Sequence, residues 1–217
     1  MEVDLHAFLT TIDLPLPIDV DDKYVWVAGD SNCFDFRSSS TWDVLRPRQD
    51  IKNWVDVVWF KGAIPKHSFN MWIANYDRMP TRSRLVAWGL PISAACPLCS
   101  NFDETRDHLL LSCAYSLAIW REVFSRCQPP VGAFTNWSEL LSWIRAATSR
   151  RLSLLRKIAT QAVVYHIWKQ RNNMVHNQQL IPPATVFNNI DKEIRNIISA
   201  RRRRKLFDSL MGDPELS

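Results

Sequence analysis

The chain has 217 residues, of which 47% are hydrophobic and 23% charged, with a formal net charge of +5 and only five glycines. This composition is typical of a globular protein and argues against a β-rich or loop-rich architecture. No run approaches the roughly 18 consecutive apolar residues of a membrane-spanning helix, and the acidic start lacks the layout of a signal peptide. We therefore expect a soluble, intracellular protein with no membrane partner.

The charge is distributed unevenly along the chain. Residues 1–24 contain six acidic residues and one basic residue, whereas residues 145–205 contain fourteen lysines or arginines and two acidic residues. A basic segment of this kind favours a polyanionic partner, with nucleic acid (RNA or DNA) as the first candidate.

The N-terminal part predicts a flexible segment followed by a small β element. Residues 1–23 are acidic and contain two prolines, which is typical of a linker or tail. The β-prone runs 24–28 and 33–36 flank a turn cluster at 29–32, which predicts a hairpin. A short helix through residues 42–45 follows, with Ser39, Ser40 or Thr41 as its cap.

Helical patterns dominate the rest of the chain. In the segment 65–76, Phe69, Trp72 and Ile73 recur at helical spacing. Near the C-terminus, Val186, Ile190, Ile194 and Ile197 form a stripe that predicts a packing face. The helices expected from such patterns and from the prolines and glycines between them cover residues 53–60, 65–76, 82–88, 114–127, 137–148, 151–176 and 183–208.

The most informative motif is C-x2-C-x8-H-x4-C, formed by Cys96, Cys99, His108 and Cys113. Thiolates and a neutral imidazole are the ligands that Zn²⁺ takes in closed structural sites. Because four protein ligands leave no position for an activated water, the motif predicts structural rather than catalytic zinc. The alternatives are a decayed site or ordinary buried cysteines.

Other residues near the motif have simpler interpretations. Asp103, Glu104 and Asp107 are interpreted as acids at a helix N-terminus rather than as ligands. His67 is interpreted as a surface histidine. His166 has no cysteine nearby and is not predicted to bind zinc.

Two groups of basic residues are candidate contacts to nucleic acid. Arg82 and Arg84 precede the zinc motif and either bind phosphate or solvate a short helix. The second group is a run near the C-terminus that favours phosphate binding, nuclear import or only a solvated helix end. It consists of Arg201, Arg202, Arg203, Arg204 and Lys205.

Further residues would extend such a surface. A phosphate-tracking stripe becomes plausible if Arg150, Arg151, Arg156 and Lys157 share the face of the basic run. Trp88 is a candidate for stacking on a base, although packing inside the protein is the favoured interpretation.

Several segments around the zinc motif carry a family resemblance. They are Trp59–Ala74, Arg78–Leu85, Trp88–Leu90, Cys96–Cys99, Glu104–Cys113 and Ala118–Trp120, with flanking similarity at Trp26–Ser40 and Ile167–Asn172. Together they resemble the reverse-transcriptase zinc-binding domain found C-terminal to the polymerase in plant non-LTR (LINE-type) retrotransposons. The resemblance covers about residues 24–125. It implies a non-catalytic domain beside catalytic units, so the chain resembles a detached C-terminal piece of such an element, either a relic or a separately expressed copy.

The predicted fold class is mainly α. A small N-terminal β-hairpin and a zinc-stapled helical domain occupy residues 24–130, preceded by the acidic segment 1–23 and followed by a basic helical tail over 131–217. We do not expect an enzyme, because the chain has no Tyr-x-Asp-Asp polymerase signature and no spaced acidic quartet for the two metals of a ribonuclease H.

The predicted function is a non-catalytic zinc-binding module of retrotransposon origin that binds RNA or DNA through backbone charge, with the nucleus as the favoured location. The alternative is a zinc-stabilised protein-interaction or structural module with no nucleic-acid binding. Zn²⁺ is the predicted cofactor in both cases. A reverse transcriptase or another protein is a further candidate partner.

Overall fold

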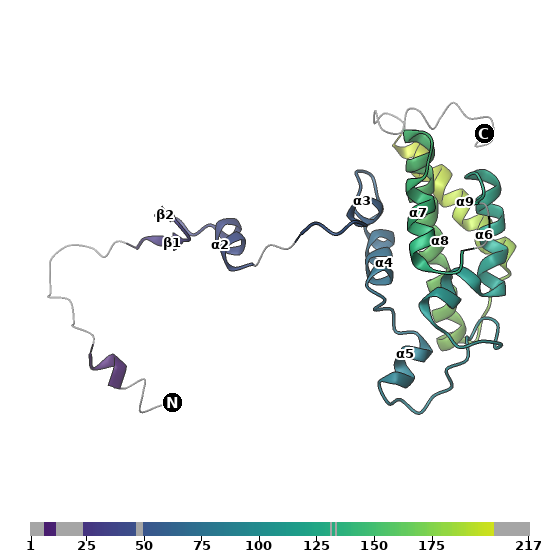
Figure 1. Cartoon of the computed structure of the whole chain (residues 1–217), viewed down its shortest axis with the longest axis horizontal. Helices are drawn as coiled ribbons and strands as arrows, with labels where there is room; N and C mark the ends of the chain where they lie inside the picture. The colour runs from purple at the N-terminus through teal and green to yellow at the C-terminus, as the bar shows by residue number, and fades with distance from the viewer. Residues whose placement is uncertain (1–6, 12–23, 47–49, 131, 133, 202–217) are drawn as a thin grey trace. The chain divides into compact units, whose positions relative to one another are not determined.

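The computed structural model describes residues 7–11, 24–46, 50–130, 132 and 134–201. Within these ranges the fold is mainly helical, which confirms the predicted fold class. The chain divides into two compact units, Met1–Asp50 and Ile51–Ser217, and each is considered by itself. The second unit holds both the zinc motif and the helices after residue 130 (Figure 1). Residue 130 is the position at which the predicted zinc-stapled domain ends. Most of the predicted acidic segment 1–23 lies outside the described residues.

A β-hairpin and one helix form the described part of the first unit. Strands β1 (Trp26–Ala28) and β2 (Ser31–Cys33) pair antiparallel, with Ala28 opposite Ser31, so the turn is two residues shorter than predicted. Gly29 in this turn has φ +60°, and a Cβ there would lie 3.2 Å from the Val44 side chain, so glycine is favoured at this position. Helix α2 (Ser38–Leu45) follows.

The second unit is built from seven α-helices and one π-helix within its described residues. Its first helices are α3 (Val55–Val58), α4 (Pro65–Asn75) and α5 (Arg82–Ala87). After the zinc motif begins, the π-helix η1 (His108–Ser112) leads into α6 (Ala114–Arg126). The chain continues through α7 (Trp137–Arg145), α8 (Arg150–Asn177) and α9 (Pro183–Ala200). These bounds confirm the predicted helices, although α3 has only four residues and residues 202–208 lie outside the described part.

Helix α8 is the centre of this unit. It has 28 residues, and helices α4, α6, α7 and α9 all contact it (Figure 1). At its start, the Ser149 hydroxyl accepts a hydrogen bond from the Leu152 N–H at 3.1 Å, which satisfies one of the free donors of the first turn. The predicted stripe of α9 is buried at Val186, Ile190, Ile194 and Ile197. No helix in the described ranges has the length and hydropathy needed to cross a bilayer.

The buried face of α4 differs from the face that the apolar spacing indicates. Phe69 is 51% exposed, whereas His67 and Ser68 are each 1% exposed. The Ser68 hydroxyl donates to Oε1 of Gln161 on α8 at 3.2 Å, so a polar pair joins the two helices internally. Burial lowers the pKa of His67 to about 4, which keeps its imidazole neutral at neutral pH. The interpretation of His67 as a surface histidine is therefore wrong.

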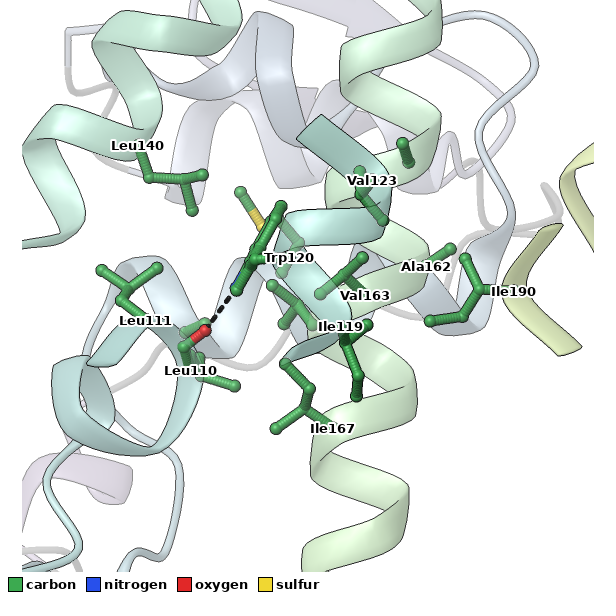
Figure 2. Close-up of a cluster of buried hydrophobic side chains, with 14 of the residues drawn as sticks. Leu110, Leu111, Ile119, Trp120, Val123, Leu140, Ala162, Val163, Ile167 and Ile190 are labelled. Carbon is green, nitrogen blue, oxygen red and sulfur yellow. Dashed lines mark hydrogen bonds between the residues drawn. The ribbon is translucent and has the colours of Figure 1, made fainter. Parts of the chain in front are cut away.

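Trp120 of α6 lies in the middle of the core. Its side chain is 1% exposed, and its indole N–H donates to the Leu110 carbonyl at 2.7 Å (Figure 2). Around it, Ile119 and Val163 bring α6 and α8 together (Figure 2). The hydrogen bond ties the π-helix to α6, so the core directly supports the backbone that carries two zinc-ligand positions.

Replacing Trp120 by phenylalanine is expected to lower the free energy of unfolding by about 1–3 kcal/mol, because the buried Leu110 carbonyl loses its donor and the smaller ring leaves space. Urea denaturation of the zinc-loaded protein measures the change. Trp59→Phe is the matched control, since Trp59 is 49% exposed, and its effect is expected to stay within about 0.5 kcal/mol. Equal stability of the two variants would contradict this role of Trp120.

Candidate metal centre

The first two ligand positions lie in a short hairpin. Ala95 and Asp103 form an antiparallel bridge, and the Cys96 N–H donates to the Phe102 carbonyl at 2.7 Å. The Ser100 N–H donates to the Cys96 carbonyl at 2.8 Å, which closes a tight turn over the Cys-Pro-Leu-Cys step. Ser100 takes a left-handed conformation, φ +58°, to complete this turn. The hairpin therefore directs the Cys96 and Cys99 sulfurs to one point.

The other two ligand positions are joined by the π-helix η1. The Cys113 N–H donates to the His108 carbonyl at 2.7 Å, a bond that spans five residues instead of the four of an α-helix. The wider turn brings His108 and Cys113 to the same side, while Leu109, Leu110 and Leu111 enter the core. At the start of η1, the Thr105 hydroxyl accepts from the His108 N–H at 3.0 Å and fixes where the turn begins.

The four side chains converge with the spacing of a tetrahedral site. Their ligand atoms all lie within 4.8 Å of one another. The Cys96 and Cys113 sulfurs are 4.0 Å apart, and the Cys99 sulfur is 3.3 Å from His108 Nε2. A tetrahedral zinc ion with Zn–S of about 2.3 Å and Zn–N of about 2.0–2.1 Å separates two sulfurs by about 3.8 Å, and a sulfur from a nitrogen by about 3.6 Å. The residues present therefore fit one zinc ion.

The ionisation of these groups also suits a metal. A hydrogen bond between the two sulfurs raises the pKa of Cys96 and lowers the pKa of Cys113. Burial lowers the pKa of His108, so its imidazole is neutral at neutral pH. The Ser112 hydroxyl lies 3.4 Å from His108 Nδ1 and leaves Nε2 directed at the sulfurs. Zinc binding to this set displaces the remaining thiol protons.

A buried ion pair fastens the hairpin to α8. Glu104 is fully buried, and its carboxylate accepts from Nε of Arg171 at 2.6 Å and from Nη2 of the same guanidinium at 2.9 Å. It also accepts from the Arg82 N–H at the start of α5, at 2.6 Å. The interpretation of Glu104 as a helix N-terminal acid is thus incomplete, because its main partner lies 67 residues away. Arg171 is a site residue that no pattern in the sequence indicates.

Both arginines before the motif are held by the protein itself. Arg82 Nη1 donates to the Ala95 carbonyl at 2.9 Å, and Arg84 donates to the Asp77 carbonyl. The Arg84 guanidinium also lies 5.1 Å from the centre of the Trp88 ring. Trp88 is 58% exposed, so the favoured interpretation that it packs inside the protein is wrong.

The basic C-terminal residues are only partly described. Arg201 is partly buried directly after α9, while Arg202, Arg203, Arg204 and Lys205 lie outside the described residues.

The predicted phosphate-tracking stripe of basic residues does not include Arg156, which lies near the start of α8. Arg156 is 5% exposed and donates to the Cys127 and Trp143 carbonyls at 3.0 and 2.6 Å, which makes it part of the interior.

The fold and the ligand set together indicate a zinc-binding module within a mainly helical protein. Residues 36–120 match a family model described as zinc-binding in reverse transcriptase, a range that contains all four ligand positions. This confirms, over that range, the resemblance to a reverse-transcriptase zinc-binding domain. Comparison with curated proteins and with solved structures gave no match.

Proposed function

We propose that this chain is a non-catalytic, zinc-stabilised module of retrotransposon origin, of the plant LINE type, that binds RNA or DNA. Four protein ligands complete the coordination of one zinc ion, so the metal acts on folding and not on a substrate. The proposed binding surface is formed by α5 and by the hairpin that carries Cys96 and Cys99. The family description, zinc-binding in reverse transcriptase, supports a role beside nucleic acid.

The observation that carries the proposal is the pairing of Arg84 with exposed Trp88. An exposed indole offers a face on which an unpaired base can stack. The adjacent Arg84 guanidinium keeps its positive charge while it donates to the neutral Asp77 carbonyl, so it still attracts the phosphate backbone. Phe102, in the hairpin, is 66% exposed and adds a second aromatic ring close in sequence to the ligands. These features favour single-stranded RNA or DNA over a duplex, because stacking requires bases that are not already paired.

Trp88→Ala is expected to weaken binding of a single-stranded oligonucleotide by about 10- to 100-fold, since one stacked base contributes on the order of 1–3 kcal/mol. Fluorescence anisotropy with labelled single-stranded RNA, single-stranded DNA and duplex DNA measures the affinities at several salt concentrations. Trp59→Ala, at another exposed tryptophan, is the control and is expected to change little. Absent binding, or an affinity that is independent of salt, would overturn the proposal.

A protein-interaction module is the second candidate, and one surface feature favours it. Val86, Trp88, Leu90, Ile92 and Phe102 are exposed apolar residues within a short stretch of chain around the ligands. Apolar residues gathered in this way are typical of a docking surface for another protein. Binding to none of the oligonucleotides, with the zinc content intact, would favour this candidate.

A nuclear location is part of the proposal and depends on the run Arg201–Lys205. Replacing the run with glutamines in a fluorescent fusion is expected to move the protein from the nucleus to the cytoplasm. The same variant is expected to show a shallower dependence of oligonucleotide affinity on salt if the run also contacts phosphates. An unchanged nuclear signal would contradict the import role.

A further inference from the structure

Three side chains from three helices meet at a second place in the bundle. His67 of α4, His166 of α8 and Glu193 of α9 bring their ligand atoms within 4.8 Å of one another. His166 Nε2 is 2.7 Å from Glu193 Oε2, and His67 Nε2 is 3.4 Å from Glu193 Oε1. Helices α4 and α9 both contact α8, so the helix packing itself creates this cluster (Figure 1).

One atom of the cluster makes no hydrogen bond, although it lies close to a carboxylate oxygen. His67 is 1% exposed, and its Nε2 forms no hydrogen bond although it lies among the other ligand atoms. A buried polar atom without a hydrogen bond is unfavourable, and such atoms in folded proteins call for an explanation. A bound metal ion that accepts the lone pair of this nitrogen supplies such an explanation.

Two imidazoles and one carboxylate are a donor set for zinc-like ions. Zn²⁺ binds histidine nitrogens and carboxylate oxygens, and sites with three protein ligands leave a fourth position for solvent. The Glu193 side chain is 24% exposed, which gives an ion a route from solvent. Lys66 opposes an ion, because its Nζ is 3.3 Å from Glu193 Oε1; its side chain is 52% exposed and has room to swing away.

We propose that His67, His166 and Glu193 form a second site for a divalent ion of the zinc class. An ion there would cross-link α4, α8 and α9 inside the bundle. The site contains no thiolate and must displace Lys66 from Glu193, so it binds more weakly than the Cys3His set. It is independent of the nucleic-acid proposal, since its residues lie outside the hairpin and α5.

The test is a calorimetric titration of Zn²⁺ into the full-length protein that already carries its tightly bound zinc. One further equivalent is expected to bind, and Glu193→Gln is expected to weaken that binding by more than about 100-fold. His176→Ala is the matched control, because His176 is an exposed histidine on the same helix α8, and this variant is expected to bind the second equivalent normally.

Lys66→Met provides a second, independent readout. Removing the competing ammonium while keeping a similar side-chain length is expected to tighten the second equivalent by about tenfold. If the cluster were only an ion-pair network, Lys66→Met would gain no zinc binding and Glu193→Gln would lose none. Either result, in a variant whose circular dichroism spectrum is unchanged, overturns the proposal.

Discussion

Replacing Cys113 by serine is expected to abolish retention of zinc and to unfold the segment between about residues 90 and 115. The sulfur of Cys113 is fully buried, and a serine hydroxyl does not replace a thiolate as a zinc ligand. Zinc binding contributes about 10–16 kcal/mol in zinc-finger peptides, comparable to the total stability of about 5–15 kcal/mol of a typical domain. Metal analysis after dialysis and amide hydrogen exchange of this segment measure the two effects.

Cys127 offers the matched control for this experiment. Its thiol is also buried, at 2% exposure, but it lies outside the four-residue cluster. Cys127→Ser is expected to keep one zinc per chain and to lose only about 1–3 kcal/mol, the cost of a buried hydroxyl without a good partner. A Cys113→Ser protein that folds normally without zinc would refute the structural role of the metal.

Removing the charge of Glu104 is expected to produce the second large effect. Glu104→Gln leaves the Arg171 guanidinium, which is 5% exposed, without its counter-ion inside the protein. Loss of one partner of a buried ion pair costs about 3–5 kcal/mol, because the remaining charge stays desolvated. We expect the free energy of unfolding in urea to fall by this amount with zinc kept in excess.

Two further variants separate this buried pair from an ordinary surface pair. Glu122→Gln is the control, since its carboxylate is 55% exposed beside Arg126 and such pairs are worth about 0–1 kcal/mol. Combining Glu104→Gln with Arg171→Met is expected to cost less than the sum of the single changes, because no uncompensated charge remains. Additive effects would show that the two side chains act independently.

The clustering of the four candidate zinc ligands was predictable because it depends on local spacing. Cys96 and Cys99 need only one turn between them, and His108 and Cys113 need only one helical turn, so a short stretch of sequence determines the set. The spacing does not predict that the turn between His108 and Cys113 is a π-helix. The π-helix follows from burying Leu109, Leu110 and Leu111 together while both ligands face the metal, which is a tertiary requirement.

The structural features that the sequence did not predict depend on contacts between residues that lie far apart in the chain. The Glu104–Arg171 pair spans 67 residues, and nothing near either residue indicates the other. His67 is polar and therefore predicts a surface position, yet it is buried beside Ser68, whose hydroxyl donates to Gln161 of α8 inside the bundle. Arg156 likewise belongs by sequence to the predicted phosphate-tracking stripe, but carbonyl groups near the ends of α6 and α7 accept its hydrogen bonds. Glu104 and Arg156 were misplaced because the interior offers their charged groups hydrogen-bond partners that lie far away in the sequence.

X-ray absorption at the zinc edge of the purified protein shows which atoms coordinate the metal. We infer that Cys96, Cys99, Cys113 and His108 complete the coordination of one structural zinc ion. For protein that retains one tightly bound equivalent of zinc, we expect three sulfur neighbours at about 2.3 Å and one nitrogen at about 2.0–2.1 Å. A zinc ion with a water ligand, or with fewer than three sulfur neighbours, would contradict this coordination.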